Sequence, residues 1–409
     1  MDKIELEKYC FILCDYYVKE FPLEMSNENY EKLIYNELIN NLQEFQDDEI
    51  KKNIKFYEES IDIIIKRYFN EKYVNRCDGN TYMKENITKS DKNEINKKLT
   101  YLKNIKQPEQ RTEEWYTFRQ EHLTASNLWK VFGTKSSINQ LIYEKCQPLN
   151  IDKYKSGFTE TPMSWGHKYE DVSIMVYEDK YKTKIYDYGC IPHKEHEYIA
   201  ASPDGINDDD NSPLFGRMLE IKNIYNRKIT GIPKKEYWIQ MQLQMEVCNL
   251  DECDFLETRF IEYTSYDEFI NDGTFTHTKN NNLKGVIMYI IDKVNKCPKY
   301  LYMPLHYNEN KYKEWEEDNM KLFNNEEYEW LKTIYWRLDE LSCVLVRRNV
   351  FWFEKAIPKL KNIWEIIIKE KKDGSYMKRA PKNKKKIINN TDDVNNSNTP
   401  KINDALIIL

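Results

Sequence analysis

Apolar residues over the first hundred positions recur at helical spacing. In YEKLIYNELINNLQEF (residues 30–45) and FYEESIDIIIKRYF (residues 56–69) they lie three or four positions apart, between charged residues. The same stretch is rich in strong helix formers. The pattern therefore predicts an all-helical segment over residues 1–110, in which each helix has one apolar face and one solvated face.

Two further helices are predicted downstream. RTEEWYTFRQEHLTASNLWKVFG combines helical spacing with Trp, Arg, Ser and Thr, and predicts a helix start at Thr124 or Ser126. WGHKYEDVSIMVYEDKY (residues 165–181) predicts a second helix, with Glu170 beside its apolar face. That face consists of Trp165, Tyr169, Val172 and Val176.

Alternation replaces helical spacing at YIAASPDGI (residues 198–206) and RMLEIKN (residues 217–223), which predict two short strands. The turn-forming sequence NDDDNSPLFG separates them. Because side chains alternate between the faces of a strand, Glu220 and Lys222 should point one way, opposite to their apolar neighbours. IPKKEYWIQMQLQMEVC then predicts a helix that places Gln240 and Gln244 one turn apart.

The rest of the chain predicts strands near residues 254–263, 285–291 and 299–305, and long aromatic-rich helices from about Tyr312 to Glu370. The polar stretch that follows has no periodicity. The expected organisation is a helical amino-terminal extension (1–110), an α/β core with a central mixed sheet (111–310), a carboxy-terminal helical region (311–370) and a flexible basic and polar tail (371–409).

Composition limits the kind of protein and the cellular compartment that can be expected. The 409 residues contain no apolar run of about 18, and MDKIELEKYC lacks the order of a signal peptide, so an intracellular protein without a membrane span is expected. The nine cysteines form no CxxC pair and are expected to be reduced thiols. A net charge of −6 argues against a uniformly basic nucleic-acid coat, but not against a site that concentrates carboxylates.

Two carboxylates and an ammonium can meet at one end of the predicted sheet. Asp204 follows Ser202 and Pro203 in a turn, and Glu220 and Lys222 share one strand face. Mg²⁺ prefers oxygen ligands, so Asp204, Glu220 and the backbone carbonyl of Ile221 can hold such an ion together with water. The sequence therefore predicts a metal and phosphate site.

Neighbouring residues extend this candidate site. Glu170 offers a third carboxylate, as a direct ligand or through water. Lys222 can position the attacking water or stabilise phosphate charge, and Gln240 can orient Lys222 or bind substrate. An E-x-K triplet alone is most often a solvated strand edge. The hypothesis therefore depends on four features that occur together, each in the type of element that the chemistry needs. They are the glutamate on a helix, the SPDG turn, the E-x-K triplet on a strand and the helix with the two glutamines.

Five motifs give the chain a family resemblance. They are FRQEHLTAS with Arg119 and Ser126, WGHKYE ending at Glu170, ASPDG containing Asp204, LEIK containing Glu220 and Lys222, and YWIQMQ containing Gln240. Over about residues 111–262 the chain resembles the lambda-type exonucleases and YqaJ-like viral recombinases of the PD-(D/E)xK nuclease superfamily. The resemblance implies a restriction-endonuclease-like central mixed sheet flanked by helices.

The resemblance also implies a function. It is the metal-dependent degradation of linear double-stranded DNA, with Mg²⁺ as cofactor and Mn²⁺ able to substitute. Asp204, Glu220 and Lys222 match the D, E and K of the signature, and Glu170 and Gln240 its additional acidic and glutamine positions. Arg119 and Ser126 match residues that grip DNA phosphate, and Thr124 is expected to help cap the same helix.

The family and the composition together indicate a large DNA virus as the source, and therefore the host cytoplasm as the location. The expected role is in recombination, repair or genome processing, and the expected partner is a single-strand annealing protein. The long additions at both ends leave the oligomeric state and the dependence on DNA ends open. Two other functions remain: a noncatalytic DNA-binding or scaffold protein that keeps the nuclease fold, and an endonuclease on branched DNA or RNA.

Three other features have competing interpretations. His193 and His196 have a spacing that fits a zinc pair, but CIPHKEHEYIAAS favours a polar hairpin. The tryptophans could form a base-stacking platform, although core positions are favoured; they are Trp315, Trp330, Trp336, Trp352 and Trp364. Lys371, Lys372 and the cluster Lys382–Lys386 could contact DNA, although a solvated tail is favoured.

Overall fold

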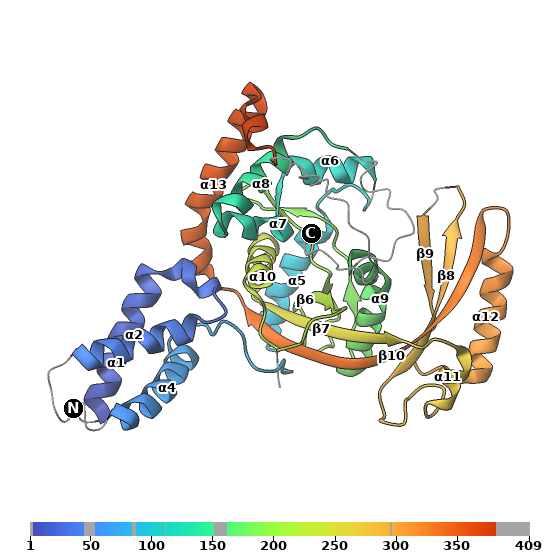
Figure 1. The fold of residues 1–409 in the computed structure, drawn as a ribbon, viewed down its shortest axis with the longest axis horizontal. Coiled ribbons are helices and arrows are strands. Elements are labelled where there is room, and N and C mark those ends of the chain that lie inside the picture. Colours follow the sequence, from blue (N-terminus) through green and yellow to red (C-terminus); the bar gives the residue numbers. More distant parts are fainter. Residues whose placement is uncertain are drawn as a thin grey trace, which may run out of the picture.

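The computed structural model describes residues 3–44, 54–83, 87–110, 112–150, 162–294 and 297–381. Its amino-terminal part is helical (Figure 1). The elements are α1 (Lys3–Glu20), the 3-10 helix η1 (Pro22–Ser26), α2 (Tyr30–Glu44), α4 (Ile54–Glu71) and α5 (Lys89–Lys103). The apolar positions that predicted these helices are buried, for example Cys10 in α1, Leu38 in α2 and Ile61 in α4, each 0% exposed.

A seven-stranded sheet forms the centre of the molecule. Its strand order is β2-β5-β6-β7-β10-β8-β9. The strands are β2 (Ile185–Tyr186), β5 (Gly205–Asn207), β6 (Met218–Asn223), β7 (Glu252–Glu262), β8 (Lys284–Asp292), β9 (Cys297–Tyr302) and β10 (Tyr328–Arg347). Strands β6 and β7 are parallel, and the other pairs are antiparallel. The predicted α/β class with a mixed central sheet is confirmed.

A second, three-stranded sheet lies beside the first part of this core. Its order is β1-β4-β3, with β1 (Leu123–Thr124) parallel to β4 (Ile199–Ala201) and β3 (Ile191–Pro192) antiparallel to it. Strand β4 leads through the SPDG turn into β5. The single strand predicted over residues 198–206 is therefore two strands in two sheets, and the turn that carries Asp204 joins them.

Helices cover both faces of the central sheet. They are α6 (Glu113–Glu121), α7 (Ala125–Leu128), η2 (Trp129–Phe132), α8 (Lys135–Cys146), α9 (Pro162–Tyr181), α10 (Lys235–Cys248), α11 (Tyr266–Asn271), α12 (Glu309–Phe323), α13 (Val350–Asp373) and η4 (Ser375–Arg379). Helix α9 packs on the face of β6 that carries Leu219 and Ile221. Helix α10 lies over the opposite face, where Tyr237 contacts Phe255 (Figure 1).

The prediction of long helices from about Tyr312 to Glu370 is wrong for residues 328–347. These residues form β10, which pairs with β7 over one half of its length and with β8 over the other. Its run CVLVR is apolar without alternation, a pattern that periodicity cannot separate from a buried helix. Because β10 occupies the middle of the sheet, the core extends well beyond residue 310.

The predicted start of a flexible tail at Lys371 is also wrong. Helix α13 continues to Asp373, and η4 follows it. Arg379 of η4 folds back and pairs with Glu370 at 2.6 Å. The basic cluster Lys382–Lys386 lies outside the described residues.

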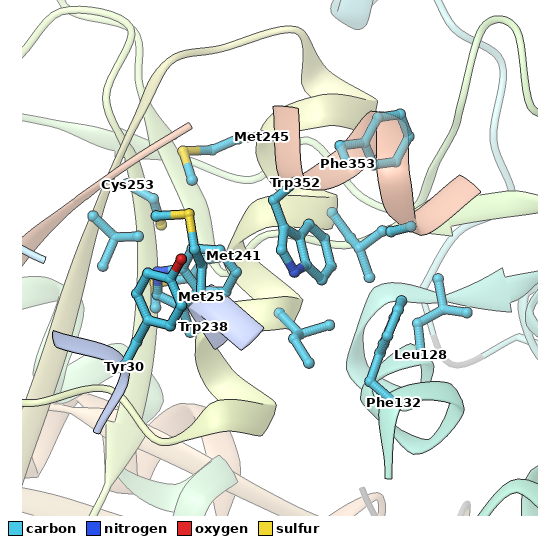
Figure 2. Packing of buried hydrophobic residues seen from close by; sticks show 14 of the residues in the cluster. Met25, Tyr30, Leu128, Phe132, Trp238, Met241, Met245, Cys253, Trp352 and Phe353 are labelled. Carbon is cyan, nitrogen blue, oxygen red and sulfur yellow. The ribbon is translucent and has the colours of Figure 1, made fainter. Parts of the chain in front are cut away.

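The amino-terminal helices share a hydrophobic core with the α/β part. Figure 2 shows Met25 and Tyr30 beside Trp238 of α10, and Trp352 of α13 beside Phe132. The rings of Trp238 and Trp352 meet edge to face at 5.3 Å. Buried aromatic side chains contribute strongly to the stability of a core. The amino-terminal helices therefore pack on the α/β part through this shared cluster.

Candidate active site

Strand β6 and the turn before β5 bring the predicted acidic residues and lysine together. Glu220 is 0% exposed, and Lys222, on the same strand face, hydrogen-bonds to its Oε1 atom. Asp204 lies just before β5, and its Oδ2 atom accepts a hydrogen bond from the backbone N–H of Ile221 at 2.6 Å. Asp204, Glu220 and Lys222 thus converge, as the alternation of β6 predicted.

Glu220 is held by a second donor from α10. The Nε2 atom of Gln244 donates to Glu220 Oε2 at 2.7 Å and to the carbonyl oxygen of Ser202 at 3.3 Å. Gln244 is fully buried. It therefore fixes the carboxylate of Glu220 and, through Ser202, the turn that carries Asp204.

Within the described ranges, no hydrogen bond joins Gln240 to Lys222, and the expected role of Gln240 in orienting Lys222 or binding substrate stays a prediction. Among the described residues, the partners of the Lys222 ammonium are the carboxylate of Glu220 and the ring of Tyr237, whose centroid is 5.1 Å away. Gln240 is one turn before Gln244 and only partly buried. Sequence periodicity placed both glutamines on the same side of α10 but could not tell which one reaches β6.

The charges of the site perturb one another. Burial and the neighbouring carboxylate of Glu220 raise the pKa of Asp204 well above its usual range. Burial alone would lower the pKa of Lys222, but the carboxylates of Glu220 and Asp204 outweigh it and raise that pKa. Lys222 is therefore a permanent cation at neutral pH.

Glu170 of α9 lies close enough to act on the same site. Its charge is among the causes that raise the pKa of Asp204. The side chain is 41% exposed, and its Oε2 atom lies 3.7 Å from Nδ1 of His167. It thus adds a third carboxylate at the solvent side of the pair formed by Asp204 and Glu220.

Asn223, the last residue of β6, connects α9 to this strand. Its Oδ1 atom accepts hydrogen bonds from the hydroxyls of Ser173 and Thr258, both at 2.7 Å. Its Nδ2 atom donates to the carbonyl oxygen of Gly166 at 2.8 Å. Since Gly166 lies one helical turn before Glu170, this amide sets where α9 presents Glu170 to β6.

The residues present suit a divalent cation of the Mg²⁺ type. Two buried carboxylates face a single lysine, and the raised pKa of Asp204 shows that burial disfavours the second negative charge, which a divalent cation would stabilise. The N–H and carbonyl of one strand residue point to the same edge, so the Ile221 carbonyl lies on the Asp204 side. Across the described ranges, no group of three or more His, Cys, Asp or Glu could hold a metal ion.

Arg119 and Ser126 are also brought together. Nη2 of Arg119 donates to Ser126 Oγ at 3.4 Å, and the guanidinium lies 4.6 Å from the ring centroid of Trp115. Thr124 occupies the N-cap position of α7, but its side chain makes no capping hydrogen bond. Thr124 pairs with Ala200 of β4, which places this motif next to the strand leading to Asp204.

A buried lysine that the sequence analysis missed supports the Arg119 segment. Lys145 of α8 donates to the backbone carbonyls of Arg119, at 2.5 Å, and His122, at 2.6 Å. In return, Gln120 donates to three carbonyls at the end of α8, those of Glu144, Lys145 and Gln147. Burial and the charge of Arg119 lower the pKa of Lys145 to about 7. Nothing in the sequence distinguishes Lys145 from the other lysines.

The competing features resolve as follows. His193 and His196 lie in the hairpin between β3 and β4, where Nδ1 of His193 accepts from the N–H groups of Glu195 and His196. This bonding indicates a hairpin rather than a metal pair. Trp336 and Trp352 are core residues at 1% and 0% exposure, whereas Trp330, on β10, is 39% exposed. No helix in the described part of the chain is long and apolar enough to cross a membrane.

Comparison with known proteins identifies the central segment. Residues 114–251 match the family model of the YqaJ-like viral recombinase domain. The chain is also 32% identical over 321 residues to the uncharacterised protein R354 of Acanthamoeba polyphaga mimivirus, covering 70% of this chain and 57% of that protein. The chain therefore spans little more than half the length of this relative.

Two solved structures show a weaker overall similarity. They are LHK-Exo in complex with dAMP (18% identity, TM-score 0.37) and the alkaline exonuclease LHK-Exo from Laribacter hongkongensis (19% identity, TM-score 0.35). Each match covers 66% of this chain and 97% of the other chain. With TM-scores this low, these matches carry no weight for the site. The match over residues 114–251 supports the predicted resemblance to the YqaJ-like viral recombinases for this segment of the chain.

Proposed function

From the premise that residues 114–251 form a YqaJ-like viral recombinase domain, we propose that the protein is a metal-dependent nuclease. Its proposed reaction is hydrolysis of phosphodiester bonds, and its proposed substrate is linear double-stranded DNA, attacked from an end. The observation that carries this proposal is the convergence of Asp204, Glu220 and Lys222. A buried carboxylate pair that faces one lysine destabilises a fold, and such arrangements are found most often at functional sites.

Asp204, Glu220 and the Ile221 carbonyl would hold Mg²⁺ or Mn²⁺, with Glu170 as a further ligand, directly or through water. Such an ion, when bound, lowers the pKa of water and neutralises phosphate charge. Gln244 keeps Glu220 in one orientation, which spares the site a rearrangement during reaction.

Lys222 has a separate part in this proposal. Because its pKa is raised by Glu220 and Asp204, it stays protonated and can donate to the attacking water or to a non-bridging oxygen of the scissile phosphate. Arg119 and Ser126 would hold a DNA phosphate on the neighbouring motif. Together these residues orient the phosphodiester and stabilise its charge.

The biological setting is proposed from the relatives. The YqaJ-like family name and the mimivirus relative support a role in recombination, repair or genome processing of a large DNA virus. Such a protein would act in the host cytoplasm and could work with a single-strand annealing protein.

The experiment that tests the proposed function compares linear and covalently closed duplex DNA, each with Mg²⁺ or EDTA. Loss of the linear substrate alone, only with Mg²⁺, is the expected result. Cutting of both substrates would replace end-dependent digestion by internal cleavage. No cleavage with Mg²⁺ or Mn²⁺ would overturn the proposal and favour a noncatalytic DNA-binding protein.

A further inference from the structure

An exposed aromatic residue lies just beyond the catalytic strand. Tyr225 follows Lys222 by three residues and is 57% exposed, although it is a large, partly apolar side chain. Three residues of chain span at most about 11 Å, so Tyr225 lies no farther than that from Lys222 along the backbone.

Single exposed aromatic residues are common on protein surfaces, so the packing of Tyr225 matters more than its exposure. Its ring meets that of Trp165 edge to face at 5.1 Å. Trp165 lies in the first turns of α9, and the ammonium of Lys168 is 4.6 Å from its ring centroid. Lys168 is itself buried and paired with Glu262 at 2.6 Å. The ring of Tyr225 therefore packs against a support, Trp165, whose position is fixed by the buried Lys168.

The same contacts connect this support to the candidate active site. Trp165 precedes Gly166, whose carbonyl accepts from Asn223 at 2.8 Å. Asn223 directly follows Lys222 in the chain and precedes Tyr225 by two residues. The positions of Lys222, Glu170 and the ring pair are thus set by one hydrogen-bonded junction between β6 and α9.

The segment after Tyr225 is basic. Arg227 and Lys228 follow within three residues, Lys234 ends the loop, and Lys235 is the first residue of α10. Arg227 pairs with Glu257 at 2.5 Å, while Lys228 is exposed. An aromatic ring with cations beside it is the combination that binds bases and backbone of single-stranded DNA.

We propose that Tyr225, supported by Trp165, is a base-stacking subsite for an unpaired nucleobase next to the scissile phosphate. This inference rests on the proposed function, because it places that phosphate at Lys222. The ligand class is the nucleobase of a frayed or single-stranded DNA end. Stacking on a ring tolerates any base sequence, so the subsite would favour DNA ends without adding sequence specificity.

The test measures DNA binding without cleavage. Linear duplexes with a three-nucleotide single-stranded end are titrated in EDTA with wild type, Tyr225→Ala and Tyr225→Phe. Tyr16→Ala is the matched control, because Tyr16 is also exposed (52%) but lies in α1. Stacking on one ring predicts that Tyr225→Ala raises Kd about tenfold, whereas Tyr225→Phe and Tyr16→Ala stay near wild type.

A substrate change separates stacking from a structural effect. Each of the three terminal nucleotides is replaced in turn by an abasic nucleotide. At the stacked position, the abasic DNA should bind wild type about tenfold more weakly than the intact DNA does. For Tyr225→Ala, the intact and the abasic DNA should have the same Kd. Equal Kd values for wild type and Tyr225→Ala, or additive losses at every abasic position, would overturn the subsite.

The outcome also separates this inference from the proposed function. Mg²⁺-dependent cleavage by wild type combined with an unchanged Kd for Tyr225→Ala would remove the subsite and leave the nuclease. Loss of binding in Tyr225→Ala without any wild-type cleavage would retain the stacking subsite on a noncatalytic DNA-binding protein. Absence of DNA binding by wild type would overturn both.

Discussion

Gln244 offers the most informative single change, because it supports the metal site without being a proposed ligand. Gln244→Leu replaces the amide by an apolar side chain of comparable volume and removes the donor to Glu220 Oε2, a bond of 2.7 Å in a fully buried position. A hydrogen bond to a charged group contributes about 1.5–3 kcal/mol. Changes of this kind behind a metal ligand typically cost about tenfold to a hundredfold in metal affinity or activity.

The same helix supplies a matched control. Gln242 is equally buried, but it donates to the carbonyl of Arg347 at 3.0 Å and accepts from the N–H of Asn349 at 2.7 Å, away from Glu220. Gln242→Leu should therefore lower the free energy of unfolding by about 1–3 kcal/mol, as Gln244→Leu should. Stability alone cannot distinguish the two variants.

The assay is the Mg²⁺ concentration that gives half-maximal DNA cleavage, measured alongside urea unfolding. Gln244→Leu should need at least about tenfold more Mg²⁺, or lose at least about tenfold in maximal rate. Gln242→Leu should match wild type in both quantities once folded. An unchanged Mg²⁺ requirement and rate in Gln244→Leu, or equal changes in both variants, would refute the role assigned to Gln244.

Three other changes test separate parts of the site. Asn223→Asp keeps both acceptor bonds but loses the donor to Gly166, so cleavage should slow about tenfold, and wild-type rates would contradict the junction with α9. Arg119→Ala should weaken DNA binding and lower its salt dependence by about one phosphate contact, with the Mg²⁺ requirement unchanged, as salt titrations of Kd can show. Lys145 has a pKa lowered to about 7, so between about pH 7 and 10.5 the unfolded chain binds more protons than the folded one. Wild type should therefore gain stability relative to Lys145→Met as pH rises through that window, and parallel unfolding profiles would contradict the lowered pKa of Lys145.

Much of the site could be predicted because local rules fix it. Strand alternation alone places Glu220 and Lys222 on one face, and a turn before a short strand places Asp204 at its end. These predictions need only the neighbours of each residue along the chain. The structure brings the three residues together as expected.

The remaining parts depend on how elements pack. Gln240 and Gln244 are equivalent by helical periodicity, and only the position of α10 along β6 selects Gln244. Lys145 and Asn223 act through partners distant in sequence, which no local pattern encodes. Strand β10 was misassigned because its apolar run fits a buried helix equally well.

The most direct test of the central claim is cleavage of an end-labelled linear duplex in Mg²⁺ by wild type, Asp204→Asn and Glu220→Gln. Both substitutions remove a carboxylate charge and nearly preserve side-chain shape, and circular dichroism and DNA binding in EDTA check folding. The structure predicts product release by wild type only, with all three proteins folded and binding DNA. Cleavage by either folded variant at the wild-type rate would contradict the assignment of Asp204 and Glu220 as the metal-binding centre.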